Sequence, residues 1–229
     1  MPQSQHILTS FDAALAKLLD DLHAMASLAQ RSLANSRTSL IDGNPDAAKA
    51  SIADDDEIDQ FEIDVTQDST FLLTRFQPLA SDLRQVVSAM RLCGDIERVA
   101  DQAVNVARKA RKLDRARVAL YRDPLAAMYD LASTLFADAL KAHTERDETL
   151  ARGIKERDRA VDALNAEITE LATEALTRDA QNVRDHLNVI LIARHIERIG
   201  DHAKNIAENA IYAASDVDVR HQKSAPPSA

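Results

Sequence analysis

Two stretches of this 229-residue sequence that read almost alike decide the fold: LCGDIERVADQAVNVA at residues 92–107 and IARHIERIGDHAKNIA at residues 192–207. They share Ile-Glu-Arg, Asp, Ala, Asn and Ala in register at an offset of 100 residues. A weaker match lies upstream, where DDEID at 55–59 corresponds to DRAVD at 158–162 at an offset of 103. Such self-similarity indicates that one supersecondary unit is used twice.

The composition is typical of a helical protein. The chain contains four glycines, six prolines, no tryptophan and only 3% aromatic residues, whereas strands are rich in aromatic and β-branched side chains. Helix-breaking residues separate segments whose apolar side chains recur with the helical period. The breaks fall at residues 43–45, Pro78, Pro124, Gly153 and residues 178–181. They predict six helices, near residues 7–41, 46–76, 80–118, 125–152, 155–177 and 181–214.

The repeat and the helix count together predict an all-α fold of two tandem three-helix bundles. The first bundle is expected to span residues 7–118 and the second residues 125–214, and each is long enough for an antiparallel bundle with short connections. Residues 215–229 end in HQKSAPPSA, which is polar and proline-rich. We therefore expect this last segment to be a disordered tail.

Charge and cysteine content exclude several classes of protein. With 28 basic and 37 acidic residues the net charge is −9, which disfavours a nucleic-acid partner because nucleic-acid binders neutralise phosphates. One cysteine, Cys93, cannot form an internal disulfide or a cysteine-rich zinc site. No apolar run approaches the roughly 20 residues of a membrane span, and the N-terminus resembles no signal peptide. We expect a cytoplasmic protein without direct membrane insertion.

The repeated motif places carboxylates where apolar residues are expected. On a helical wheel, Glu97 and Asp101 lie within about 40° of Leu83 and Met90, so the acids are expected in the middle of the apolar stripe of their helix. Glu197 and Asp201 lie on the corresponding stripe in the second half, and the acids at residues 55, 59 and 62 border the apolar face of the second predicted helix. A solvent-exposed run of charge would lie on the opposite face.

Helical hairpins bring these acids to common levels. If the second and third helices pair around Pro78, residues 57 and 99 lie opposite one another, and in the second half the corresponding midpoints are residues 160 and 199. Each half then contains four carboxylates at one level. The predicted metal ligands are Asp55, Asp59, Glu97, Asp101, Asp158, Asp162, Glu197 and Asp201.

Four partly buried carboxylates require positive charge nearby, because repulsion and lost hydration cost several kcal/mol per ion. One interpretation is a site for several hard cations, which bind oxygen ligands. A second is a core neutralised by arginines such as Arg98, although Arg98 lies about 100° from Glu97 on the helix. A third is that the acids are protonated or lie at the exposed rim. We also predict a set of polar residues that supports the ligands indirectly: Asp82, Arg84, Arg98, Asn105, Arg184, Arg198 and Asn205.

The predicted ligands restrict the identity of the metal only in part. Oxygen ligands favour magnesium, manganese or iron over copper or structural zinc. The Glu-x-x-His signature of ferritin-like di-iron bundles is absent, because Ala100 and Gly200 stand three residues after the two glutamates. His195 and His202 flank the second motif and could donate hydrogen bonds around the ligands, although a lone helical histidine more often has a structural role.

Several of these motifs together resemble the PhoU family of accessory and regulatory proteins of bacterial phosphate-specific transport. The resemblance rests on DDEID and DRAVD, on QPLASDLR at residues 77–84, and on DIERVAD at 95–101 and HIERIGDHAKNIAE at 195–208. Three departures are visible: Val99-Ala100 replaces the family's usual Ile-Gly, His195 stands where an aromatic residue is common, and Asn182 replaces the aspartate of the DLR box. Because Asn182 is the counterpart of Asp82, a ligand role for Asp82 is weakened.

The resemblance implies two similar three-helix bundles and multinuclear metal clusters on the eight predicted ligands, with iron, manganese, magnesium and zinc as candidate metals. It also implies a negative regulator, without enzymatic activity, of phosphate uptake and phosphate-starvation signalling. The implied partners are the phosphate ABC transporter, through its ATPase subunit, and a phosphate-sensing histidine kinase, and the implied state is a homodimer. Two other functions stay open at this point: a carboxylate-bridged metalloenzyme and a purely structural helical dimer.

Overall fold

The computed structural model of the chain describes residues 2–116, 119–179 and 181–215, with side chains from Thr9 onward. Within these residues the chain forms six α-helices and a short 3-10 turn, and no strand. The helices are α1 (Pro2–Asp42), α2 (Pro45–Phe76), α3 (Ala80–Ala110), α4 (Arg122–Glu145), α5 (Glu148–Arg178) and α6 (Val183–Ser215), and the 3-10 turn η1 covers Ala119–Tyr121.

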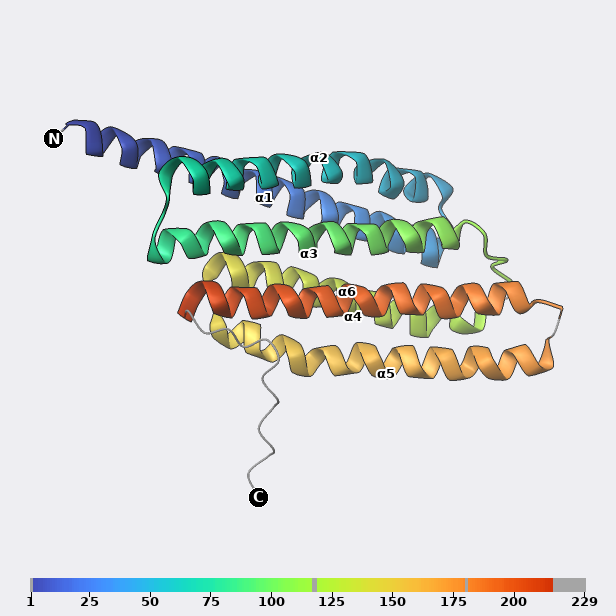
Figure 1. Cartoon of the computed structure of the whole chain (residues 1–229). Helices are drawn as coiled ribbons and strands as arrows, with labels where there is room; N and C mark the ends of the chain where they lie inside the picture. The colour runs from blue at the N-terminus through green and yellow to red at the C-terminus, as the bar shows by residue number, and fades with distance from the viewer. Residues whose placement is uncertain (1, 117–118, 180, 216–229) are drawn as a thin grey trace, which may run out of the picture.

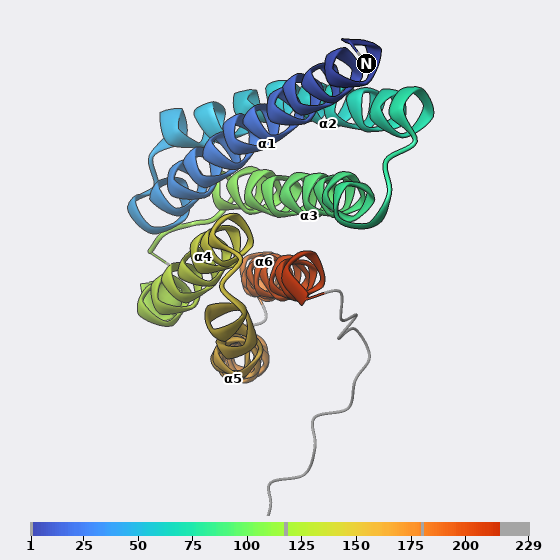
Figure 2. The same cartoon turned by 90° about the vertical axis from the view of Figure 1, so that its left-hand side faces the viewer.

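The six helices form two three-helix bundles that pack through α3 and α6 (Figure 1). Helices α1 and α2 lie on the side of α3 that faces away from α6, whereas α4 lies beside α6 and α5 lies beyond both. Figure 2, the view from one end, shows α3 and α6 next to one another between the outer helices. The predicted fold class is confirmed, and the third helix of each repeat makes most of the contact between the bundles.

Two of the predicted breaks show how local chemistry ends and starts these helices. The Asn44 side chain caps α2 by accepting hydrogen bonds from the backbone N–H groups of Asp46 and Ala47, and Pro45 occupies the first helical position, where a missing N–H costs nothing. Helix α2 ends at Gln77, which adopts a left-handed conformation with φ of 49° just before Pro78. The hairpin between α2 and α3 therefore turns where the sequence predicts it.

Several predicted boundaries are wrong. The third helix ends at Ala110 and not at residue 118, because the charged stretch that follows offers few apolar side chains to bury. The predicted break at Gly153 lies inside α5; the chain turns instead at Arg146, in a left-handed conformation, and at Asp147, whose side chain accepts from the Leu150 N–H. A glycine costs a helix only about 1 kcal/mol, whereas a capping aspartate starts one.

Both chain ends also differ from expectation. Helix α1 begins at Pro2, earlier than the predicted residue 7, and α6 extends to Ser215, the first residue of the predicted tail. The rest of the predicted disordered segment, residues 216–229, lies outside the described residues. No helix in the part of the chain that the structure describes is both long and apolar enough to cross a membrane.

Polar contacts cross the packed bundles near the repeated motifs. His195 Nδ1 lies 2.8 Å from Gln102 Oε1, and His202 Nδ1 lies 2.9 Å from Asp95 Oδ1. The two pairs are repeat mates, because each histidine is 100 residues from a member of the other pair. These contacts join α3 to α6, so both histidines serve the interface between the bundles.

A histidine inside the same interface makes the fold sensitive to acid. His143 Nε2 lies 2.8 Å from Ser88 Oγ, and burial lowers the pKa of His143 to about 4, with a further lowering by Arg146 and His23. The folded state therefore favours neutral His143, and the stability that this contributes is fully present above the unfolded pKa of about 6.5 and is lost as the pH falls toward 4.

We predict that the free energy of unfolding drops more steeply in wild-type protein than in a His143→Gln variant when the pH is lowered from 7 to 5. The difference between the two drops should be about 1–2 kcal/mol, measured by urea unfolding at each pH. Equal drops in both proteins would show that His143 is not the group responsible.

Candidate metal site

Each bundle has an acidic patch between the second and third helices of its repeat. The first acidic patch consists of Asp55, Asp59 and Glu62 on α2 with Glu97 and Asp101 on α3. The second acidic patch consists of Asp158 and Asp162 on α5 with Glu197 and Asp201 on α6.

The hairpin geometry brings the predicted ligands of the first bundle together. Burial raises the pKa of Asp55, and the charges of Asp59 and Asp101 raise it further, while the Arg108 guanidinium opposes them. Burial likewise raises the pKa of Glu97 to about 6; Arg98 lowers it, and the carboxylates of the same patch raise it. Acids from α2 and α3 therefore act on one another directly, as the register around Pro78 predicts.

The patch lies at the edge of the buried face of α3 and not in its middle. Leu83 and Met90, which share the stripe of Glu97 on the helical wheel, are exposed, whereas Val86, Cys93 and Ile96 form the buried face. The expectation that the acids occupy the centre of the apolar stripe is therefore wrong. Asp59 is exposed, whereas Asp55, Glu97 and Asp101 are half-buried, so the patch borders solvent.

Arginines provide only partial countercharge to the first acidic patch. Arg98 Nε lies 3.3 Å from Glu97 Oε2, and an Arg108 guanidinium nitrogen lies 3.5 Å from an Asp55 oxygen. Both arginine side chains are more than half exposed, which weakens the interaction through solvent screening. Glu97 Oε2 is itself buried and accepts no hydrogen bond from any described residue. The patch therefore retains an excess of negative charge.

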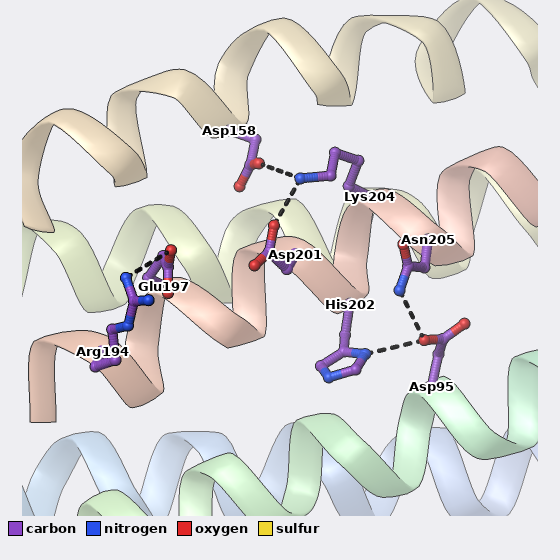
Figure 3. Close-up of polar contacts among 8 residues, drawn as sticks. All are labelled: Asp95, Asp158, Arg194, Glu197, Asp201, His202, Lys204 and Asn205. Carbon is purple, nitrogen blue, oxygen red and sulfur yellow. Dashed lines mark hydrogen bonds and ion pairs between the residues drawn. The ribbon is translucent and has the colours of Figure 1, made fainter. Parts of the chain in front are cut away.

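The second acidic patch contains a cation of its own (Figure 3). Lys204 Nζ lies 3.1 Å from Asp158 Oδ2 and 2.6 Å from Asp201 Oδ1, so the ammonium bridges α5 and α6. Asp158 is buried, and its carboxylate lies over Gly200, where an added Cβ would come within 2.4 Å of Asp158 Oδ1. Arg194 also contacts Glu197, at 3.4 Å. Burial raises the pKa of Asp158, and Lys204 opposes that shift.

Sequence reasoning missed Lys204 and did not include Glu62 among the predicted ligands. Lys204 lies inside the repeated motif, but its repeat mate is the fully buried Val104. The similarity of the two repeats therefore does not predict a lysine at this position. Glu62 adds a fifth acid to the first patch, and its mate in the second half is Asn165, whose Oδ1 is buried and has no hydrogen-bond partner among the described residues. Comparing the two repeats position by position is the signal that could have found these differences.

The predicted supporting residues divide into two groups. Arg98 and Arg198 lie next to the acids: Arg98 contacts Glu97, and the charge of Arg198 helps to lower the pKa of Glu197, which burial raises overall. Asn105 is half-buried on α3, one turn after the last acid of its motif. The others point elsewhere or lie too far away.

Asp82, Arg84 and Arg184 occupy the first turns of α3 and α6, about 20 Å along the helix from the glutamates of their motifs. Asn205 donates a hydrogen bond to Asp95 Oδ1, at 3.3 Å, across the bundle interface (Figure 3). The structure therefore does not bring these four residues to the acidic patches.

The donor chemistry of the first acidic patch fits a hard cation, because its side chains offer only carboxylate oxygens. Among the described residues, however, no group of three or more histidine, cysteine, aspartate and glutamate side chains converges as a ready-made ion site. A cation at the patch would require rotation of exposed acids such as Asp59 toward Glu97. The metal thus stays a prediction, and its ligands are the carboxylates named above.

Comparison with known proteins agrees with the repeat. The PhoU domain matches residues 22–110 and again residues 125–210, one match in each bundle. The chain belongs to the PhoU family. A relative from Rhizobium meliloti (strain 1021), a phosphate-specific transport system accessory protein PhoU homolog, is 32% identical over 222 residues, covering 92% of this chain and 89% of that protein.

Solved structures of PhoU proteins share the whole architecture. The crystal structure of PhoU from Pseudomonas aeruginosa is 30% identical in sequence and has a TM-score of 0.84. The match covers 90% of this chain and 100% of that chain. The phosphate transport system regulatory protein PhoU from Streptococcus pneumoniae is 25% identical, with a TM-score of 0.83 that covers 91% of this chain and 99% of that chain. The two-bundle arrangement is therefore a property of the PhoU family.

Proposed function

We propose that this protein is a regulatory accessory protein of a phosphate transport system and represses phosphate uptake and phosphate-starvation signalling when phosphate is plentiful. The observation that carries the proposal is the match of the PhoU domain to both bundles, which leaves no third domain of comparable size among the described residues. The names of the relatives, accessory and regulatory proteins of phosphate transport, support the same role.

We propose further that the protein acts by binding its partners and not by turnover. Those partners are the phosphate ABC transporter, through its ATPase subunit, and a phosphate-sensing histidine kinase, both reached from the cytoplasm, and the acting form is a homodimer. The long, rigid helices suit this role, because they present extended surfaces of fixed shape. This mode of action accounts for the acidic patches as regulatory elements without assigning them a reaction.

The first acidic patch is the proposed metal site. A divalent cation bound there supplies the positive charge that Arg98 and Arg108, both exposed, provide only in part. Glu97 and Asp101 would bind from α3, and Asp55 and Asp59 from α2, so that the bound ion fixes the two helices relative to one another. Such a site couples cation binding to the shape of the first bundle, which the partners contact.

A genetic experiment tests the regulatory role. In the bacterium that carries the gene, deletion is expected to raise phosphate uptake and alkaline phosphatase activity in phosphate-rich medium, and the wild-type gene to restore repression. A Glu97→Gln/Asp101→Asn variant should fail to restore it. The control Asp56→Asn/Glu57→Gln, at two exposed acids of α2 outside the patch, should restore repression fully. Unchanged uptake and phosphatase activity after deletion would contradict the proposed function.

Metal should also stabilise the fold. Because a ligand that binds only the folded state adds RT ln(1 + [L]/Kd), Mn²⁺ at ten times its dissociation constant is expected to add about 1.4 kcal/mol to the free energy of unfolding. The Glu97→Gln/Asp101→Asn variant should not respond to Mn²⁺, and in metal-free buffer it should be more stable than wild type because repulsion is relieved. Calorimetry with and without chelator measures both effects. A rise in stability with unchanged phosphate regulation would favour a purely structural role.

A further inference from the structure

The two repeats superpose in sequence but differ in charge at the level of the acidic patches. The first bundle has Val104 and Glu62 where the second has Lys204 and Asn165. At these two positions the second patch gains one positive charge and loses one negative charge relative to the first. The glutamate and aspartate of each motif are the same in the two halves, but Arg194, which contacts Glu197, stands where the first half has Gly94. Likewise, Arg108, which contacts Asp55, stands where the second half has Glu208.

Lys204 lies at the end of the second patch that contains Asp158 and Asp201. Its ammonium contacts one carboxylate from each helix, Asp158 on α5 and Asp201 on α6, at hydrogen-bond distance (Figure 3). The side chain is only 27% exposed, and that of Asp158 is 5% exposed. A cation bound between Asp158 and Asp201 would need the oxygens that Lys204 already holds.

The backbone of α6 is shaped for this arrangement. Gly200 leaves the space into which the Asp158 carboxylate fits, and an alanine there would collide with it. The repeat mate of Gly200 is Ala100, which is fully buried, so the first bundle has no equivalent space on α3. Asp55, the mate of Asp158, is accordingly more exposed and meets Arg108 at the rim. The aspartate that is buried in the second bundle is half-buried in the first.

We propose that Lys204 is a built-in cation that takes the place of a metal ion in the second acidic patch, so that divalent metal binds the first patch in preference to the second. The inference rests on the proposed function, because it takes metal binding by the first patch as its starting point. The two bundles of one chain then have different tasks: the first responds to cations, and the second is held in a fixed shape by its lysine.

The test uses Mn²⁺ as probe and the full-length chain without an affinity tag. Bound Mn²⁺ per chain is measured by elemental analysis after equilibrium dialysis, and the affinity of binding is measured by titration calorimetry. In the otherwise unchanged chain, the double substitution Glu97→Gln/Asp101→Asn is expected to abolish Mn²⁺ binding. The matched double substitution in the other repeat, Glu197→Gln/Asp201→Asn, is expected to leave the number of Mn²⁺ ions per chain unchanged.

Removing the lysine charge is expected to create the missing site. Lys204→Met should raise the bound Mn²⁺ per chain roughly twofold, because the second patch then offers its carboxylates to the ion. Adding Glu197→Gln/Asp201→Asn to Lys204→Met should remove that gain. Lys141→Met, at an exposed lysine of α4, is the control and should behave as wild type. The comparison of the two glutamate–aspartate variants does not depend on Lys204→Met being well folded.

The outcomes separate the inference from the proposed function. Equal losses of Mn²⁺ from the two glutamate–aspartate variants would overturn the inference and leave metal binding standing. No Mn²⁺ bound by wild type or by Lys204→Met would overturn both. Loss confined to the first patch, with a gain in Lys204→Met, is the result that the geometry predicts.

Discussion

Replacing Lys204 with alanine is expected to lower the free energy of unfolding by about 3 kcal/mol in metal-free buffer, because breaking a buried ion pair leaves the remaining charge without a partner. The stranded group is Asp158, whose side chain is 5% exposed and whose second close neighbour, Asp201, is itself an acid. Urea unfolding measures the change. The effect comes from the cost of an unpaired carboxylate and not from the exposed end of the lysine.

Two controls make this result specific. Lys49→Ala removes an equally close ion pair, to Asp46 at 2.9 Å, but both of those side chains are highly exposed, so the expected loss is below about 1 kcal/mol. Adding Asp158→Asn to Lys204→Ala should recover much of the loss, because the stranded charge is gone. A loss no larger than that of Lys49→Ala would show that Lys204 is not a buried structural cation.

Substituting Gly200 with alanine is expected to destabilise the protein by about 2 kcal/mol, against the usual preference for alanine in a helix. The added Cβ would stand 2.4 Å from Asp158 Oδ1, so the carboxylate must leave its place and its contact with Lys204. Thermal or urea unfolding of the variant measures the loss.

Gly94 provides the matched control, because it is also inside a helix of the same repeat motif but has no described atom within 4 Å of an added Cβ. Gly94→Ala is therefore expected to stabilise the protein by up to about 1 kcal/mol through helix propensity alone. Opposite signs for the two glycine substitutions support the account. Stabilisation by both would mean that Asp158 moves without cost.

Much of the fold could be predicted because helix breakers and the repeat are local and strong signals. Gly43, Asn44 and Pro45 end one helix and start the next, and Pro78 fixes a hairpin whose register places Asp55 opposite Asp101. The end of α3 was not predictable in the same way, because residues 111–116 include good helix formers, yet Arg115 leaves the helix and donates a hydrogen bond to the Ile41 carbonyl at 2.6 Å. Tertiary packing decides such a boundary, and sequence propensity does not.

The sequence predicts the positions of the carboxylates in the acidic patches but not their countercharge. Wheel and hairpin arithmetic locate the carboxylates, since both depend on spacing alone. The countercharge depends on side-chain reach: Lys204 extends from α6 to Asp158 on α5, and Arg108 from α3 to Asp55 on α2. The exposure of Leu83 and Met90 likewise depends on which sides of α3 are covered by α1, α2 and α6. Spacing within one helix contains neither kind of information.

The most direct test of the central claim, that the first acidic patch binds metal in a PhoU-family regulator, is the metal content of the full chain purified without an affinity tag. We predict at least one divalent or ferric ion per chain, retained in Asp56→Asn/Glu57→Gln and lost in Glu97→Gln/Asp101→Asn. A chain that holds no metal as purified and none after reloading with iron, manganese, magnesium or zinc would contradict the claim, and the excess negative charge of the patch would then be carried without an ion.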